Sequence, residues 1–286
     1  MQIEKDLLVV GNLAKDVVFG DVRMGGCAAS IAVNSRRLGL RTGIMSVLGT
    51  DDFSQQYRQF LSQNGIDVSL VSDCLETLPV CEVTSKDNSI SSSTWNDNGC
   101  HSAMDLLPID RKMREYSLVH LVSCPPRLAR RISDIPLLRL SYEPGPMLMV
   151  DTAYFDPAVR DRSDFVFFNQ EEFEVVLNSL NTSNPSEIVK DSGRVVVVTR
   201  DEQGSDIYYL EDGVLKIDHI DALLADKIVD HTGAGDCYKS GFFATYLRGK
   251  NISEACKIGA VAGCLCVSQK GGFLSDESIL QVKKKY

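Results

Sequence analysis

The chain has 286 residues, 44% of them hydrophobic and 24% charged, which is typical of a globular protein that can bury one substantial core. A formal net charge of −9 argues against a nucleic-acid partner, and no apolar run is long enough to span a membrane. The nine cysteines form no C-x-x-C pair and the four histidines no H-x-x-x-H pair, so free thiols are favoured over a disulfide framework or a zinc site.

The first expected strand follows the N-terminus directly, without the basic and then apolar order of a signal peptide, so we expect a cytoplasmic protein. Short apolar runs predict strands at residues 7–10, 44–48, 118–122, 147–150, 165–168 and 195–198. Helical patterns lie between them at residues 28–38, 53–63, 171–180 and 185–190, and the chain from Cys237 onward is expected to be mostly helical. This alternation predicts an α/β fold, a doubly wound and mostly parallel sheet with helices on both faces.

Residues 79–104 interrupt this alternation with a polar stretch that contains Trp95, Asn98 and His101. We expect one or two edge strands or a mobile loop here, forming a small lid on a single domain that spans residues 1–286. Trp95 either stacks on a sugar or a base or anchors the loop, and His101 is expected at the surface.

A glycine-rich segment, Asp230-His-Thr-Gly-Ala-Gly-Asp236, stands where a loop is expected to become a helix. The first amides of a helix have no internal partners, and glycines let the backbone approach an anion closely. An acid at the end of a phosphate-binding loop is repelled by the phosphate, which suggests that Asp236 takes a proton from an attacking hydroxyl. The alternative is a glycine-rich turn with Asp236 as an ordinary N-cap.

Two further segments place polar groups or free amides at expected strand or helix ends. Asn12 and Asp16 follow the first strand, and ligands of open α/β sheets bind at the carboxyl ends of strands. A carboxylate there can accept hydrogen bonds from a polyhydroxylated ligand. Gly25 and Gly26 then lead into a helix, which is either a second ligand-facing junction or a plain turn.

Three motifs occur in a fixed order: Gly25-Gly26 followed by a helix and Leu38-Gly39, then Asn169-Gln-Glu-Glu172, then Thr232-Gly-Ala-Gly-Asp236. Together they resemble the ribokinase (PfkB-type) family of sugar and nucleoside kinases over nearly the whole chain. The resemblance implies a ribokinase-like fold and an enzyme that transfers the γ-phosphoryl group of ATP to a hydroxyl of a small polyol. It also implies Mg²⁺ as a cofactor and, in some members, K⁺.

The resemblance assigns a role to each matching residue. Asp236 would be the catalytic base, and the amides of Gly233, Ala234, Gly235 and Asp236 would form an anion hole for the transferred group. Asn169 and Glu172 would organise Mg²⁺, largely through water, while Thr199 and Gly204 would lie near the nucleotide. Asn12, Asp16, Gly25, Gly26 and Ser30 would contact the substrate, and Asp230 and Thr232 would lie beside a K⁺ ion. Without the resemblance, Glu171 and Glu172 would be acids that interact with a helix dipole.

The chain departs from the family pattern in three places. Ser30 stands where many members have Asn, which puts a sugar-hydroxyl contact in doubt. The common Thr-x-Gly near the nucleotide is Thr199-Arg-Asp201, so a carboxylate stands near phosphates unless Arg200 or a metal compensates or the loop turns it outward. The span between Asp16 and Gly25 is short, so the lid is expected to be reduced to residues 79–104.

The sequence therefore predicts an ATP-dependent kinase whose acceptor is a ribose-like sugar, a nucleoside or a cyclitol such as myo-inositol. It is expected to be a monomer or a homodimer. The alternative is a regulator that binds a ligand or nucleotide and has lost turnover, which Ser30 and Asp201 favour and the intact Asp236 opposes. A Rossmann dehydrogenase and a P-loop kinase are disfavoured, because neither G-x-G-x-x-G after the first strand nor G-x-x-x-x-G-K-[ST] is present.

Overall fold

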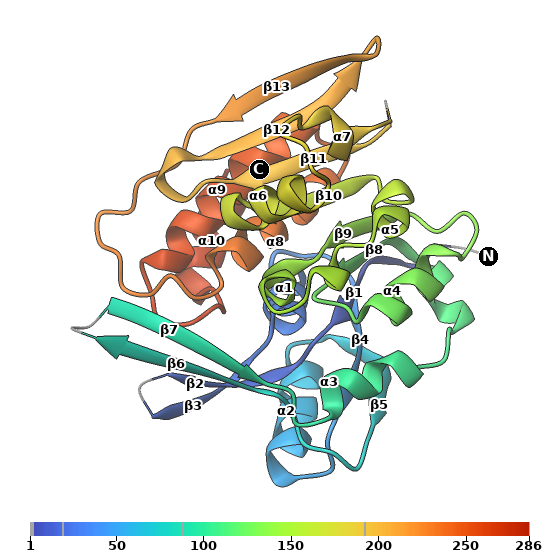
Figure 1. Cartoon of the computed structure of the whole chain (residues 1–286). Coiled ribbons are helices and arrows are strands. Elements are labelled where there is room, and N and C mark those ends of the chain that lie inside the picture. The colour runs from blue at the N-terminus through green and yellow to red at the C-terminus, as the bar shows by residue number, and fades with distance from the viewer. Residues whose placement is uncertain (1–2, 19, 87–88, 192, 286) are drawn as a thin grey trace.

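One large sheet crosses the computed structural model, which describes residues 3–18, 20–86, 89–191 and 193–285. Residues 1–2, 19, 87–88, 192 and 286 lie outside the described residues, and 87–88 belong to the expected lid segment. The strand order is β13-β12-β11-β10-β9-β8-β1-β4-β5 (Figure 1). The strands are β1 (Lys5–Gly11), β4 (Thr42–Leu48), β5 (Asp67–Asp73), β8 (Tyr116–Val122), β9 (Leu140–Glu143), β10 (Phe165–Asn169), β11 (Val195–Thr199), β12 (Ser205–Glu211) and β13 (Val214–Ile220).

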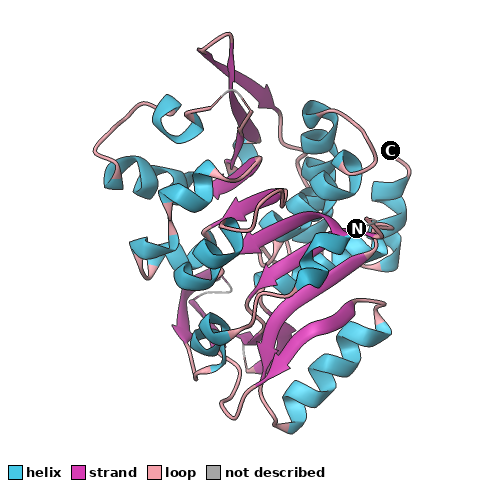
Figure 2. Cartoon of the chain, turned by 90° about the vertical axis from the view of Figure 1, so that its right-hand side faces the viewer, coloured by secondary structure: helices cyan, strands magenta, loops and turns pink. Residues whose placement is uncertain are grey.

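The seven strands β11, β10, β9, β8, β1, β4 and β5, in their order across the sheet, run parallel to one another. β12 and β13 extend this sheet in antiparallel fashion. Residues 7–10 and 196–198 are fully buried, because helices cover both faces of the sheet (Figure 2). The longer helices are α1 (Cys27–Arg37), α2 (Asp52–Gln63), α4 (Pro126–Ser133), α6 (Gln170–Ser179), α8 (Ala234–Tyr246), α9 (Ile252–Val267) and α10 (Asp276–Lys283). The predicted doubly wound sheet is confirmed.

The expected strand at residues 147–150 is wrong. That segment lies in a 3-10 helix, η3 (Gly145–Met149), and the strand of this region is β9. Pro144 and Pro146 flank Gly145, whose φ is 67°, and proline has no N–H to donate to a sheet ladder. The chain therefore leaves the sheet directly after Glu143, the last residue of β9.

A smaller sheet projects from the body and has the strand order β3-β2-β6-β7 (Figure 1). Its strands are β2 (Ala14–Val18), β3 (Asp21–Gly25), β6 (Val80–Lys86) and β7 (Ser89–Asn96). One or two edge strands or a mobile loop were expected within 79–104, and β6 and β7 lie there. The expectation that the lid is reduced to residues 79–104 is wrong, because β2 and β3 belong to the same small sheet. These two five-residue strands fit into the short span up to Gly25 because the chain turns sharply, with a φ of 85° at Gly20.

Helix α8 is anchored on the sheet by aromatic side chains. The ring of Phe242 lies 5.1 Å from that of Phe167 on β10, and the ring of Phe243 lies 5.7 Å from it, both edge-on. These contacts hold α8 against the sheet. Among the described residues, no helix combines the length and the apolar character that crossing a bilayer requires.

Candidate active site

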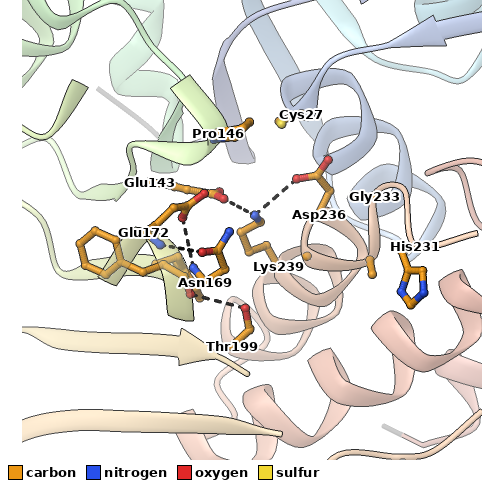
Figure 3. Close-up of a pocket in the computed structure, with 14 residues that line it drawn as sticks. Cys27, Glu143, Pro146, Asn169, Glu172, Thr199, His231, Gly233, Asp236 and Lys239 are labelled. Atoms are coloured by element: carbon orange, nitrogen blue, oxygen red, sulfur yellow. Dashed lines mark hydrogen bonds and ion pairs between the residues drawn. The ribbon is translucent and has the colours of Figure 1, made fainter. Parts of the chain in front are cut away.

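A cavity of about 250 Å³ opens where β9, β10 and β11 end and α8 begins (Figure 3). Its floor and walls bring together segments that are far apart in the sequence, which is the expected position for a ligand in an open α/β sheet. The lining residues are Cys27, Glu143, Pro146, Phe167, Phe168, Asn169, Glu172, Thr199, His231, Gly233, Ala234, Gly235, Asp236 and Lys239. The predicted residues 169, 172, 199 and 233–236 are thus assembled in one place.

The first residues of helix α8 line this cavity, and the Ala234 amide donates to the His231 carbonyl at 3.3 Å. Gly233 is the N-cap of this helix, with a left-handed φ of 77° and no side-chain cap, and Asp236 is the third helical residue. The reading of Asp236 as an ordinary N-cap is therefore wrong. A Cβ on Gly233 would stand 2.5 Å from the Cα of Gly272, whereas a Cβ on Gly235 would come no nearer than 3.7 Å to Lys239 Nζ. The protein itself has room for a side chain at Gly235, so the bare backbone there leaves space in the cavity.

Asp236 is buried, with an exposed fraction of 8%. Burial raises the pKa of its carboxyl group to about 6, while the neighbouring ammonium of Lys239 acts in the opposite direction. A carboxyl group with such a pKa is ionised at neutral pH and can accept a proton there.

Lys239 and Glu143, which were not among the predicted site residues, form a buried ion pair at the floor of the cavity (Figure 3). Lys239 Nζ donates to Glu143 Oε1 and lies 3.4 Å from Asp236 Oδ1. Burial alone would lower the pKa of Lys239, but Glu143 and Asp236 raise it above its ordinary value. A lysine one turn after the expected base, on an otherwise apolar helix, was the available sequence signal.

Asn169 and Glu172 form a capping box at the start of α6. Asn169 Oδ1 accepts from the Glu172 amide at 2.8 Å, and the Glu172 carboxylate accepts from the Asn169 amide at 3.1 Å. Burial, followed by the charge of Glu143, raises the pKa of Glu172 to about 7. The motif therefore has a structural role and also presents oxygen atoms to the cavity, the ligand type that Mg²⁺ prefers.

The expected nucleotide segment lies beside the same cavity. Thr199 lines it, at the end of β11, and its hydroxyl donates to the Phe168 carbonyl at 3.4 Å. Gly204 lies outside the cavity lining, in the turn that leads into β12. This position requires glycine, because a Cβ there would stand 2.1 Å from the Ile220 carbonyl oxygen. Asp201 is exposed, with a left-handed φ of 48°. Arg200 pairs with Asp206 at 2.6 Å rather than with Asp201.

The small sheet carries a second group of polar residues, outside the lining of the cavity. Asp16 on β2 is in register with Arg23 on β3 and with Cys81 on β6, and Cys81 is in register with Trp95 on β7. Residues in register share one face of a sheet, so Arg23, Asp16, Cys81 and Trp95 form a row across all four strands. Burial and the negative charge of Asp236 raise the pKa of Asp16 to about 7, which ties this row to the base.

Small residues bring the Asp16 carboxylate against the start of α1. A Cβ on Gly25 would overlap the Asp16 carboxylate, and a Cβ on Gly26 would stand 2.6 Å from the Asn12 carbonyl oxygen. Asn12 is buried, and its side-chain oxygen has no hydrogen-bond partner in the described part of the chain. Asn12, Asp16, Gly25 and Gly26 therefore form one cluster. Asn12 directly follows β1, as expected, but the expected place of Asp16 at the end of the first strand is wrong, because Asp16 lies within β2.

Ser30, Asp230 and Thr232 contact the segment after α9 or one another. The Ser30 hydroxyl packs against Gly272, since a Cβ on that glycine would stand 2.7 Å from the hydroxyl oxygen. Asp230 accepts from the Thr232 amide and from the Gly271 amide, each at 2.9 Å, and lies 3.9 Å from Arg23 of the small sheet. These contacts brace the loop that leads into α8.

The expectation that His101 lies at the surface is wrong. Its ring is buried, its Nε2 is 2.7 Å from the Tyr154 hydroxyl, and the two rings are stacked. Trp95 packs edge-on against His101 with ring centroids 5.6 Å apart. The small sheet is thereby joined to the body at the end of β7, because Trp95 is anchored by an aromatic contact.

The chain matches the model of the pfkB family of carbohydrate kinases over residues 10–278. It belongs to this family. A nucleoside kinase of Methanothermobacter thermautotrophicus is 31% identical over 301 residues, covering 95% of this chain and 92% of the relative. The chain is therefore a phosphotransferase.

Two solved structures are similar to this one over almost their whole length. A nucleoside kinase of Methanocaldococcus jannaschii, an archaeal member of the ribokinase family, aligns with a TM-score of 0.84 and 23% identity, covering 100% of both chains. A nucleoside kinase of Burkholderia thailandensis, solved in complex with ADP-inosine, aligns with a TM-score of 0.80 and 19% identity, covering 97% of this chain and 95% of that one. The pfkB-family member described here thus has the ribokinase-like fold.

Proposed function

We propose that the protein is an ATP-dependent nucleoside kinase in which Asp236 takes the proton from a nucleoside hydroxyl as that hydroxyl attacks the γ-phosphorus of ATP. The observation that carries this proposal is the position of Asp236. It lies in the first turn of α8 and close enough to Asp16 for its charge to raise the pKa of Asp16. One acid thus stands between a site for phosphate and a site for hydroxyl groups.

In this mechanism the bond from the acceptor oxygen to the γ-phosphorus forms while the bond to the ADP leaving oxygen breaks. The proton of the hydroxyl passes to the Asp236 carboxylate. Charge on the transferred group spreads over its oxygens, and the amides of Gly233, Ala234, Gly235 and Asp236 are fixed dipoles that stabilise it. Thr199 lines the cavity from the end of β11 and would lie beside the phosphates.

The donor set at the cavity fits a magnesium ion held through water. Asn169 and Glu172 supply amide and carboxylate oxygens; the pKa of Glu172 is raised by burial and then by the negative charge of Glu143, a charge that a cation would offset. When bound, Mg²⁺ would offset charge on the phosphates. A potassium ion beside the loop that holds Asp230 and Thr232 belongs to the same proposal.

A nucleoside is the proposed acceptor because a relative that is 31% identical over nearly its full length is a nucleoside kinase. The row on the small sheet supports it. Asp16 can accept from sugar hydroxyls, and Trp95 at the end of the row offers an aromatic surface for a base. A sugar or a cyclitol would use Asp16 without the aromatic end.

The test is ADP release with Mg-ATP across purine and pyrimidine nucleosides, sugars and cyclitols, with wild type beside Asp236→Asn. We expect nucleosides to drive turnover and Asp236→Asn to reduce kcat by about two to four orders of magnitude while ATP still binds. Asp212→Asn is the matched control, because Asp212 is an exposed acid in the turn between β12 and β13. Turnover with sugars or cyclitols alone would overturn the nucleoside assignment, and ATP binding without any turnover would favour a regulator.

A further inference from the structure

Lys239 extends from α8 across the floor of the cavity and ends between two carboxylates. Its Nζ lies 3.4 Å from Asp236 Oδ1 and donates to Glu143 Oε1, as Figure 3 shows. Only 6% of the residue is exposed. The ammonium group therefore has almost no water and takes its stabilisation from the two acids.

A buried charged trio of this kind is an expensive way to hold a helix against a strand. Each buried ion loses several kcal/mol of hydration, which a well-packed apolar pair would avoid. Lys239 lines the same cavity as the start of α8. Its position thus points to a role for the charge at the cavity.

His120 lies next to the second carboxylate oxygen of Glu143, and Ser141 in turn contacts His120. Glu143 Oε2 lies 3.5 Å from His120 Nε2, and neither atom has another partner within the described ranges. His120 Nδ1 lies 3.0 Å from the Ser141 hydroxyl oxygen, and burial lowers the pKa of His120 so that the ring is neutral. Ser141, His120, Glu143, Lys239 and Asp236 form one continuous chain from the centre of the sheet to the proposed base.

We infer that Lys239, oriented by Glu143, is a positioning residue that fixes the Asp236 carboxylate and holds it in the ionised form in which it can accept the acceptor proton. This inference rests on the proposed function and adds a residue pair to it. The Lys239 charge neutralises Asp236 only in part, because it is shared with Glu143. Asp236 is therefore ionised and still basic enough to take a proton.

Several other groups face the Asp236 carboxylate and contribute to its titration. Cys27 comes from α1, Asp16 from β2, Glu143 from β9, Glu172 from α6 and Lys239 from α8. Among these groups Lys239 is the cation, so its removal leaves Asp236 among acids and a thiol. Glu143 acts on Asp236 with the opposite sign, because it is a neighbouring negative charge.

Lys239 and Glu143 shift the pKa of Asp236 in opposite directions, and the pH profile of kcat/KM for Lys239→Met and for Glu143→Gln tests this. The part of the profile that falls at low pH, its acid limb, reports the protonation of Asp236. We expect the acid limb of Lys239→Met to move up by about one pH unit, because an opposite charge within contact distance has been removed. We expect the acid limb of Glu143→Gln to move down, because Lys239 then serves Asp236 alone. Lys239→Arg keeps the charge and should restore most of the limb.

The controls separate this inference from the proposed function. Lys257→Met removes an exposed lysine of α9 and should leave the limb unchanged. Circular dichroism checks that each variant is folded. If both cavity variants move the limb in the same direction, or neither moves it, while Asp236→Asn abolishes turnover, this inference is overturned and the proposed function stands. If Asp236→Asn retains full turnover, the proposed function itself has failed.

Discussion

Gly233 and Gly272 lie back to back, so that a Cβ on Gly233 would stand 2.5 Å from the Cα of Gly272. Gly272 belongs to the turn between α9 and α10, and its carbonyl accepts from Asn34 Nδ2 at 2.8 Å. Asn34 of α1 thereby holds this turn against the start of α8. The glycine of the predicted anion hole thus has a steric reason inside the protein, in addition to any ligand.

This contrast gives a prediction for the two glycines of the loop. Gly233→Ala should destabilise the fold by about 1–2 kcal/mol or more, because it forces a left-handed residue and a clash. Gly235→Ala should leave stability unchanged or raise it by up to about 1 kcal/mol, since alanine favours a helix, yet it should weaken ATP turnover. Denaturant unfolding and ADP release measure the two effects. A Gly235→Ala enzyme with normal turnover would show that no ligand approaches this amide.

A second prediction concerns Asp16, whose pKa is raised to about 7 by burial and by Asp236. A carboxyl group with a raised pKa favours folding at low pH, and that contribution is lost as the pH rises through about 7. Asp16→Asn should therefore raise Tm by about 3 °C at pH 8 and by less at pH 5, while acceptor affinity falls.

Asp6 is the control of opposite sign for that experiment. Burial alone would raise the pKa of Asp6, but its hydrogen bonds with Arg41 lower it. Asp6→Asn should lower Tm at pH 7, and the difference should shrink as the pH falls below the ordinary pKa of an aspartate. Thermal unfolding of both variants between pH 3 and pH 8 measures the two trends. Equal shifts of Asp16→Asn at every pH would contradict the role of ionisation.

A third prediction concerns Asp201, which adopts a φ of 48° where the family pattern has glycine. Asp201→Gly removes the strain of a left-handed residue but adds entropy to the unfolded chain, so the unfolding free energy should change by less than about 0.5 kcal/mol. Removing a negative charge near the phosphates should lower KM for ATP about two- to threefold at low salt. Glu202→Gln, a change at the exposed neighbour, is the control. An unchanged KM would place the Asp201 carboxylate away from the nucleotide.

A fourth prediction concerns the joint between the small sheet and the body. Tyr154→Phe removes the partner of His101 Nε2 and leaves a second unpaired nitrogen on a buried ring. The unfolding free energy should fall by about 1–3 kcal/mol, as expected when a buried polar group loses its hydrogen bond. Chemical denaturation measures this loss. A stability equal to wild type would indicate that water reaches the ring.

The sequence predicted the fold where local pattern and tertiary environment agree. Residues 165–168 and 195–198 are continuous apolar runs because both faces of these strands are covered, and they form β10 and β11. The strand β9 was not predicted, because its sequence Leu-Ser-Tyr-Glu is short and mixes apolar and polar residues. The strands β2 and β3 were not predicted, because most of their residues are partly buried or exposed and the alternation of apolar and polar residues is therefore weak.

The candidate site divides in the same way. The glycines and acids of residues 230–236 and 169–172 were visible as motifs, since each motif depends on the local start of a helix. The pairing of Glu143 with Lys239 joins positions 96 residues apart, and only the order of strands and helices brings them together. The burial of His101 likewise depends on Tyr154, from a 3-10 turn beyond the next two strands.

The small sheet is built from two separate segments of the chain, β2–β3 and β6–β7, and this affects the order in which it can form during synthesis. Its central pair joins β2 to β6, and residues 19–79 lie between these strands. The hairpin of β2 and β3 can therefore pair with β6 only after β4, α2, β5 and β6 itself have been synthesised. Non-local pairings of this kind form slowly, because a long loop must close first. The face that holds Asp16 becomes complete once β7 has been synthesised, about a third of the way along the chain, whereas α8, with Asp236, emerges near the end.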